Sequence, residues 1–384
     1  MNRKRTLAWW PFAAGLFGGA CSDSTLRPDA AVVDATVDAP RIPETGREID
    51  LLFIIDDSPS MADHQANLRA NLPNFVNVLQ TILGGLPNVH IGVVSSDLGT
   101  SGSADAQPGP AFGTGPGACS GYGKAGNLLT QSSPLVAGDY IIDIKNTDGS
   151  RTTNYSGSLA QAFSAIADAG TSGCEFEQPL EAAKRALAPT HLSNQGFLRP
   201  EAYLALIFIQ DEDDCSLSHS SMLAPENPTL GPLESFRCTR FGVTCDVGGT
   251  TPDAMNQVGS KTQCHPNESS AYLSSVASYV TYFKGLKTDP LKVIVAGVMG
   301  VPEPFEVELR TPPGGTSAIP ALAHSCSYTG ASGLEVADPP TRLKFFIDQF
   351  QNRSSYTTIC QQNLTEGLVL VAQLLGAAMT AARP

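Results

Sequence analysis

The sequence predicts an α/β fold, a doubly wound and mostly parallel sheet with helices on both faces. Short, almost unbroken apolar runs alternate with stretches of helical period along residues 48–380. Strands separated by helices pair in parallel, and continuously apolar strands are typical of a sheet covered on both faces. No second linker divides this span, so we expect one enlarged domain rather than the two that its length allows.

Each element of this fold has a local signal in the sequence. Residues 50–56 and 89–96 are apolar runs that predict strands, and the stretch between them has one apolar helical face, with Pro73 expected to kink or restart the helix. An edge strand is expected near 140–144. The remaining predicted elements are helices 158–169 and 178–187, strand 202–210, helix 269–286, strand 291–298, and helices 340–350 and 364–378.

Three long irregular segments, 99–139, 213–266 and 300–338, interrupt this order. Each follows a strand that should run parallel to the first, so each leaves the sheet at its carboxyl edge, where ligands bind in open α/β sheets. Of the nine cysteines, eight remain besides Cys21, and six of those eight lie in these segments. We therefore expect a disulfide-rich cap over this edge; the alternative is a set of passive insertions.

The most informative motif lies where the first predicted strand ends. Asp56, Ser58 and Ser60 stand at alternate positions of one turn. Carboxylate and hydroxyl oxygens are hard ligands that suit Mg²⁺. The alternative is ordinary loop chemistry, because Asp and Ser are also common in turns and at helix N-termini.

This loop resembles the first metal loop of the von Willebrand factor type A domain, a Rossmann-type fold shared with integrin I domains. Two later loops of that family supply a Thr and an Asp, and Thr171 (with Ser172 as a substitute) and Asp211 stand in the matching order here, although Pro59 is atypical. The resemblance implies a metal-ion-dependent adhesion site for Mg²⁺, Mn²⁺ or Ca²⁺. Ser58 and Ser60 would bind the ion directly, and Asp56, Thr171 and Asp211 directly or through water. The open position would take an Asp or Glu carboxylate of a protein ligand.

The cysteines outside residue 21 are even in number, which favours disulfides in an oxidising compartment. If the two later metal loops meet at one ion, Cys174 and Cys215 are close enough to bridge. A second expected bridge joins Cys326 and Cys360, and the others would pair among themselves. The alternative is a zinc site, for which the Cys-x-x-Cys spacing is lacking; its residues would be Cys238, Cys245, Cys264 and His265.

Residues 1–21 are predicted to be a signal peptide, with a basic start, an apolar stretch and small residues before Cys21. This end is similar to the cleavage site of bacterial lipoproteins, so we expect a lipid on Cys21; ordinary cleavage nearby is the alternative. Residues 22–47 are rich in Asp, Ala, Pro and Val and predict a disordered tether. The protein would then be exported, an outer-membrane lipoprotein on the periplasmic or cell-surface face, held by its lipid anchor alone.

The charge pattern excludes one class of partner and leaves smaller questions open. A net charge of −13 and no basic stripe argue against nucleic acid as a partner.

The acidic run 211–214 is expected to be a solvated turn, with a second cation site as the alternative. Asp57 is either a hydrogen-bond acceptor that orients the first loop or an exposed residue. His64 is expected to be an exposed helix residue.

The resulting functional hypothesis is a cell-envelope adhesion module that captures a protein ligand through a divalent cation. The alternative is a structural lipoprotein that scaffolds an envelope assembly without metal. An enzyme is not expected, because neither a Gly-x-Ser-x-Gly elbow nor a His-Glu-x-x-His motif occurs. Residues 121–126 match a dinucleotide motif by letter only, since they follow a Gly/Pro-rich loop rather than a strand.

Overall fold

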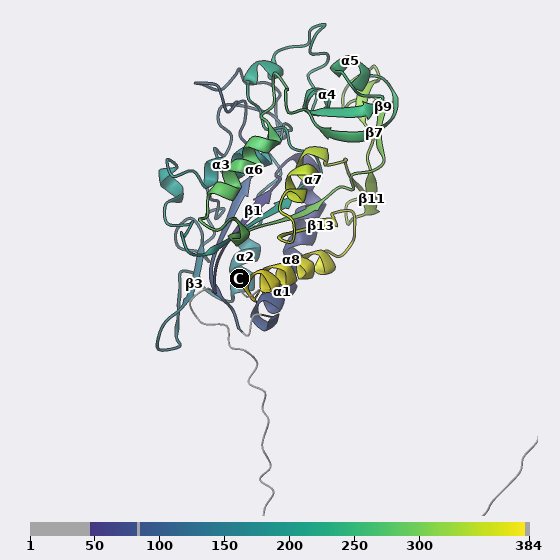
Figure 1. Ribbon diagram of the computed structural model, residues 1–384. Coiled ribbons are helices and arrows are strands. Elements are labelled where there is room, and N and C mark those ends of the chain that lie inside the picture. Colours follow the sequence, from purple (N-terminus) through teal and green to yellow (C-terminus); the bar gives the residue numbers. More distant parts are fainter. Residues whose placement is uncertain (1–46, 83–84, 381–384) are drawn as a thin grey trace, which may run out of the picture. The chain divides into compact units, whose positions relative to one another are not determined.

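The computed structural model describes residues 47–82 and 85–380, with a seven-stranded sheet at its centre (Figure 1). Its strand order is β13-β8-β5-β1-β2-β3-β4; the first five pair in parallel, and β3 and β4 extend one edge antiparallel. The predicted α/β architecture with a mostly parallel sheet is confirmed. The strands are β1 (Glu48–Ile55), β2 (Asn88–Ser95), β3 (Ile141–Lys145), β4 (Arg151–Thr153), β5 (Tyr203–Ile209), β8 (Val293–Met299) and β13 (Ser354–Thr358).

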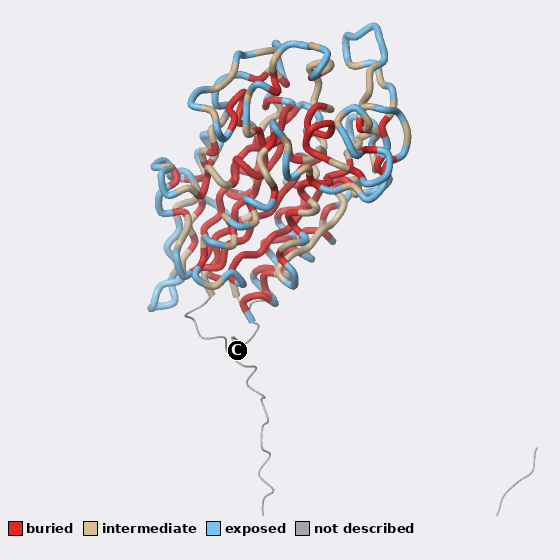
Figure 2. Tube along the Cα trace, turned by 45° about the horizontal axis from the view of Figure 1, so that its top comes forward, coloured by how far each residue is buried: buried red, intermediate tan, exposed pale blue. Residues whose placement is uncertain are grey.

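Helices cover both faces of this sheet, and the buried core lies between the layers (Figure 2). Successive side chains of a strand point to opposite faces, so Leu51 and Phe53 join one core while Leu52 and Ile54 join the other. On the first face lie α1 (Ala62–Ile82), α2 (Leu159–Ile166) and α8 (Thr365–Thr380); on the second lie α3 (Pro179–Ala186), α6 (Val276–Gly285) and α7 (Thr341–Asp348).

Helix α1 continues through Pro73, so the expected restart is wrong. Proline has no N–H for the carbonyl four residues earlier, which here belongs to Arg69. The Ser164 hydroxyl of α2 donates to that Arg69 carbonyl oxygen at 3.3 Å. A neighbouring helix thus satisfies the acceptor that Pro73 leaves free.

Two other elements differ from expectation. Helix α6 begins at Val276 rather than near residue 269, because Ser275 caps it and the Glu268 carboxylate accepts from both the Ser275 hydroxyl and the Ala277 N–H. Strand β13 was not predicted. Its residues are polar and half-buried, so the sequence there lacks the apolar run that marks a central strand.

The long insertions contain more regular structure than expected, and they gather at one end of the sheet (top of Figure 1). Strands β6, β7, β9 and β10 form a four-stranded antiparallel sheet, and β11 pairs with β12. These elements are α4 (Phe236–Gly242), β6 (Val243–Val247), α5 (Pro252–Met255), β7 (Gly259–Pro266), β9 (Phe305–Arg310), β10 (Ile319–Leu322), β11 (Cys326–Thr329) and β12 (Leu334–Ala337). Short 3₁₀ turns lie at Pro59–Met61, Leu192–Asn194, Ser220–Leu223 and Pro290–Lys292.

Four disulfides link the described residues: Cys119–Cys174, Cys215–Cys238, Cys245–Cys264 and Cys326–Cys360. The predicted bridge between Cys326 and Cys360 is confirmed. The predicted bridge between Cys174 and Cys215 is wrong, although their segments do lie side by side, since the Cys215 N–H donates to the Glu177 carbonyl at 2.8 Å. The zinc alternative is also wrong, because disulfides occupy all three of its cysteine sulfurs.

The predicted signal peptide of residues 1–21, its lipidated Cys21 and the tether of residues 22–47 lie outside the described residues, apart from Arg47. Within the described ranges, no helix combines the length and the apolar character needed to cross a bilayer. The apolar terminal helix α8 instead packs in the core beside α1, where the Thr365 hydroxyl donates to Asn71 Oδ1 at 2.6 Å.

A buried network of charges lies at the amino ends of the parallel strands. Asp50 accepts from the Arg199 backbone N–H at 2.7 Å and from its Nε at 2.8 Å, and the Lys287 ammonium lies 3.8 Å away. Burial raises the pKa of Asp50 to about 6 and lowers the pKa of Lys287 to about 8. The carboxylate therefore ties β1 to the segments that precede β5 and β8.

Replacing this carboxylate should destabilise the fold. Asp50→Asn leaves the buried Lys287 and the half-buried Arg199 without this counter-charge, and we expect the free energy of unfolding to fall by about 3–5 kcal/mol. Urea unfolding with the disulfides intact measures the change. Asp139→Asn, at an exposed position, should stay within about 0.5 kcal/mol of the wild type. Equal effects of the two substitutions would contradict a structural role for the network.

Candidate functional site

The candidate site lies at the carboxyl edge of the central sheet, between β1 and β5. After β1 the chain builds β2, β3 and β4 on one side, and it then returns to build β5, β8 and β13 on the other. Ligands bind in open α/β sheets at such a reversal of strand order. The Asp56 N–H donates to the Ile209 carbonyl at 3.1 Å, so the loops that follow β1 and β5 leave the sheet together.

Four of the five predicted metal ligands meet at this edge. The Ser58 N–H donates to Asp56 Oδ1 at 2.7 Å, and the Ser58 and Ser60 hydroxyls lie 2.9 Å apart. The Asp211 carboxyl lies beside the Ser60 hydroxyl and the Asp56 carboxyl. Asp56, Ser58 and Asp211 are buried, whereas Ser60 is exposed. The site therefore has a buried acidic side and an open side at the serine hydroxyls.

Two oxygen atoms of this cluster are buried without a hydrogen-bond partner, namely Asp56 Oδ2 and Asp211 Oδ1. Burial raises the pKa of both carboxyls, well above the usual value for Asp56, and their mutual repulsion raises the pKa of Asp56 further. An unpaired buried carboxylate is costly, and a divalent cation bound by both aspartates and the serine hydroxyls would remove that cost. Within the described residues no three His, Cys, Asp or Glu side chains form a metal site by themselves, so the fit depends on the hydroxyls.

Thr171 lies in a segment that is fastened to the first loop on both flanks. The Gln65 amide donates at 2.7 Å both to the Asp56 carbonyl and to the Gly170 carbonyl. On the other flank the Gly173 N–H donates to the Asp57 carbonyl at 2.7 Å. In the described part of the chain, however, no hydrogen bond joins the Thr171 side chain to the aspartates and serines. Its place as a ligand remains a prediction.

The sequence left open whether Asp57 is a hydrogen-bond acceptor that orients the first loop or an exposed residue, and the structure shows the acceptor. It is buried, accepts from the Ser95 hydroxyl at 2.6 Å and pairs with the Lys124 ammonium. Lys124 also donates to the Ala169 carbonyl at 2.8 Å. One lysine from the first insertion thus joins the loop after β1 to the segment that carries Thr171, a role that no sequence pattern indicates.

His64 is buried, so its predicted exposure is wrong. Strand β12 covers it, with the Val336 carbonyl 3.4 Å and the Glu335 carboxylate 4.0 Å from His64 Nε2. The positive charge of His64, when protonated, opposes the effect of burial on the pKa of Asp211. A strand from the third insertion therefore shapes the electrostatics of the candidate site.

The acidic run 211–214 is not a solvated turn, which corrects the prediction. Asp213 accepts from the backbone N–H groups of Arg342 and Leu343 in the first turn of α7. Asp214 is fully buried, accepts from the Leu180 N–H at the start of α3 and pairs with the Arg342 guanidinium at 3.0 Å. Carboxylates stabilise helix N-termini in this way, so two of the four acids hold helices.

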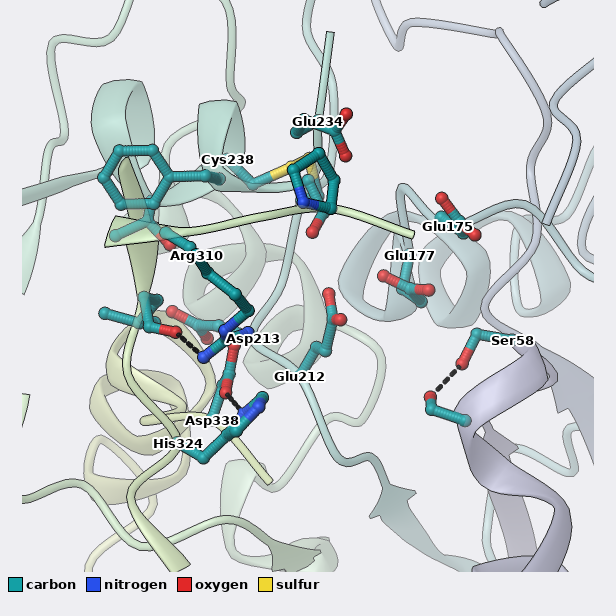
Figure 3. A pocket seen from close by; sticks show the side chains of 18 of the residues that line it. Ser58, Glu175, Glu177, Glu212, Asp213, Glu234, Cys238, Arg310, His324 and Asp338 are labelled. Carbon is teal, nitrogen blue, oxygen red and sulfur yellow. Dashed lines mark hydrogen bonds and ion pairs between the residues drawn. A yellow bond between two sulfur atoms is a disulfide. The ribbon is translucent and has the colours of Figure 1, made fainter. Parts of the chain in front are cut away.

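A pocket of about 250 Å³ opens beside Ser58 and Ser60 (Figure 3). Its lining comes from the loops after β1 and β5, from helix α4 of the second insertion, and from strands β9 and β10 of the third. The sequence predicted a cap in general terms but none of its acidic lining. Those acidic residues are Glu175, Glu177, Glu212, Asp213, Glu234 and Asp338.

Comparisons with known proteins assign no family to this chain. No family model and no curated protein matches the chain. Among the solved structures that match is the conserved hypothetical protein BatB from Bacteroides thetaiotaomicron, at 12% sequence identity and a TM-score of 0.31, over 86% of this chain and 98% of that one. A likeness at this level leaves the function to be argued from the site itself.

Proposed function

We propose that this chain is a von Willebrand factor A-like binding module that captures a protein ligand through a divalent cation, Mg²⁺ in the first instance. The observation that carries the proposal is the pair of buried, unpartnered oxygens of Asp56 and Asp211 beside the hydroxyls of Ser58 and Ser60. Hard oxygen donors of this kind suit Mg²⁺. Thr171 would complete the set directly or through water.

These candidate ligands would leave one coordination position of the cation open. Both aspartates lie on the buried side, and the exposed Ser60 borders the pocket. The bound ion supplies a positive charge that attracts a carboxylate. Because only two carboxylates, those of Asp56 and Asp211, would bind it, such an ion would keep enough positive charge to attract an Asp or Glu of the ligand. The chain's own residues fix the loops, through Gln65, Asp57 and Lys124.

We further propose that the protein works in the cell envelope, as a lipoprotein anchored through Cys21. Four disulfides support an oxidising compartment, since such bonds are rare in reducing ones. A chain tethered in this way would present its metal edge to partners outside the cytoplasm.

Substitution of one candidate ligand should separate metal binding from folding. Asp56→Asn keeps the Oδ1 acceptor for the Ser58 N–H but removes the charge. The wild-type Tm should rise in Mg²⁺, because a ligand at 100 times its Kd adds about 2.7 kcal/mol, and the variant should not respond. In chelator the variant should melt at or above the wild-type Tm, since one buried charge is gone. Differential scanning fluorimetry measures both values, with Asp139→Asn as the control.

If the Asp56→Asn and Asp139→Asn variants responded equally to Mg²⁺, the cation would not bind at this loop. A loss of response together with a lower Tm in chelator would show only that the variant folds poorly. Asp211→Asn, at the other strand end, should then repeat the expected pattern if the two aspartates share an ion.

The Mg²⁺ effect should grow with pH. The pKa values of Asp56 and Asp211 are raised in the folded protein, so without metal their contribution to stability is present at low pH and lost as pH rises through those values. A cation binds the charged carboxylates and displaces their protons. The rise in Tm caused by Mg²⁺ should therefore be larger at pH 8 than at pH 5. An equal or larger rise at pH 5 would contradict this.

Partner capture should depend on the same ion. Purified chain coupled to beads should recover a protein from envelope extract in Mg²⁺ but not in chelator, and Asp56→Asn beads should recover none. Amidation of the extract's carboxyl groups should also abolish recovery. Capture that persists in chelator and with the variant would instead support the alternative function, a scaffold that works without metal.

A further inference from the structure

Four glutamates line the pocket beside Ser58 and Ser60: Glu175, Glu177, Glu212 and Glu234. For the first three, no cation among the described residues offsets the charge, whereas the Arg237 guanidinium opposes the effect of burial on the pKa of Glu234. Figure 3 shows Glu177 and Glu212 facing the same open space, with Ser58 near Glu177. The unpaired acids thus surround a cavity that adjoins the candidate metal edge.

The remaining charged groups of the wall are already engaged. Asp213 caps α7, and the Asp338 carboxylate lies 2.6 Å from His324 Nδ1. Arg310 donates to the Glu308 carboxylate at 2.9 Å and to the Leu322 carbonyl at 2.8 Å. Among the described residues that line the pocket, no free cation is left to offset Glu175, Glu177 and Glu212.

Glu177 is the member of this group that points most directly to a ligand. Its side chain is 2% exposed, and its Oε1 is buried with no hydrogen-bond partner. Its backbone is fixed, because the Cys215 N–H donates to the Glu177 carbonyl and Cys174 is held by its disulfide. The Glu177 Oε1 atom is therefore free to accept from a donor group that enters the pocket.

Apolar side chains also contribute to the lining of the pocket. Phe236 of α4 lies there with Pro312, Ile319 and Leu322 of the third insertion. A long basic side chain has the matching composition, with a methylene stem that packs on apolar surface and a charged end that needs an acceptor. The glutamates also suit such a group better than a second metal ion, since no three acidic side chains converge into a metal site among the described residues.

We propose that this pocket binds the basic side chain, Lys or Arg, of the same protein ligand whose carboxylate would reach the cation at Ser58 and Ser60. The inference deepens the proposed function, on which it depends for the carboxylate but not for the basic group. It also predicts which protein ligands the site selects. The unpaired glutamates would repel a purely acidic ligand, and only a ligand with an acidic and a basic side chain close together would satisfy both subsites.

The basic subsite can be tested without the metal. In chelator, saturation-transfer NMR with the full chain should detect binding of Nα-acetyl-lysine amide, and of the uncharged Nα-acetyl-norleucine amide at least about tenfold more weakly. Glu177→Gln should weaken the lysine probe by about tenfold. This substitution keeps the shape of the side chain, and the variant should keep the Mg²⁺-induced rise in Tm. Glu366→Gln, at an exposed position of α8, should change neither.

A second set of probes joins the two subsites. In Mg²⁺ the acetylated dipeptide amide Asp-Lys should bind more tightly than Asp-norleucine or Asn-Lys. Tight binding of both Lys probes with no gain from Asp would retain the basic pocket and overturn the metal proposal. Equal binding of lysine and norleucine probes, in chelator and in Mg²⁺, would overturn the inference, as would a lysine affinity that Glu177→Gln and Glu366→Gln leave equally unchanged.

Discussion

The candidate site at the carboxyl edge of this sheet depends on two carboxyls, those of Asp56 and Asp211, that are buried without a paired cation among the described residues. The opposite edge shows the contrast, because there Asp50 is buried against Arg199 and Lys287. Asp56 and Asp211 have no such partner, and each keeps an oxygen atom free of hydrogen bonds. A fold tolerates uncompensated buried charge at few places, and strained or costly arrangements of this kind concentrate at functional sites. The same sheet therefore has one edge where the buried carboxylate is paired and one where two buried carboxyls keep an oxygen atom without a partner, the arrangement on which the metal proposal rests.

The acidic run after β5 shows how closely these two uses can lie. Asp213 and Asp214 fasten the first turns of α7 and α3, so they position the helices that pack on one face of the sheet. Among the described residues Asp211 and Glu212 cap no helix: Asp211 lies beside Ser60 and Asp56, and Glu212 lines the pocket together with Asp213. Two consecutive pairs of acids thus divide one charged segment between the candidate site and helix capping, and substitutions in the two pairs would have different consequences for stability.

The apolar runs made β1, β2, β5 and β8 predictable, because a strand buried on both faces must be apolar at nearly every position. The polar strand β13 offers no such pattern. The loop motif and the strand order predicted that Asp56, Ser58, Ser60 and Asp211 lie together, because the ends of neighbouring parallel strands meet. By contrast, the burial of His64 comes from a strand about 270 residues away, and the partner of Cys174 was set by the path of the first insertion. Local patterns contain neither fact.

The insertions have a further physical consequence for the pocket. Cys215 and Cys238 both line it, and their disulfide joins the segment after β5 to helix α4, which contributes to the apolar lining. The segment of Glu175 and Glu177 is joined through Cys174 to the first insertion. One disulfide thus holds the segment of Glu212 beside helix α4, and another restrains the backbone next to Glu175 and Glu177. A site whose lining is restrained in this way binds its ligand with less ordering of its own loops.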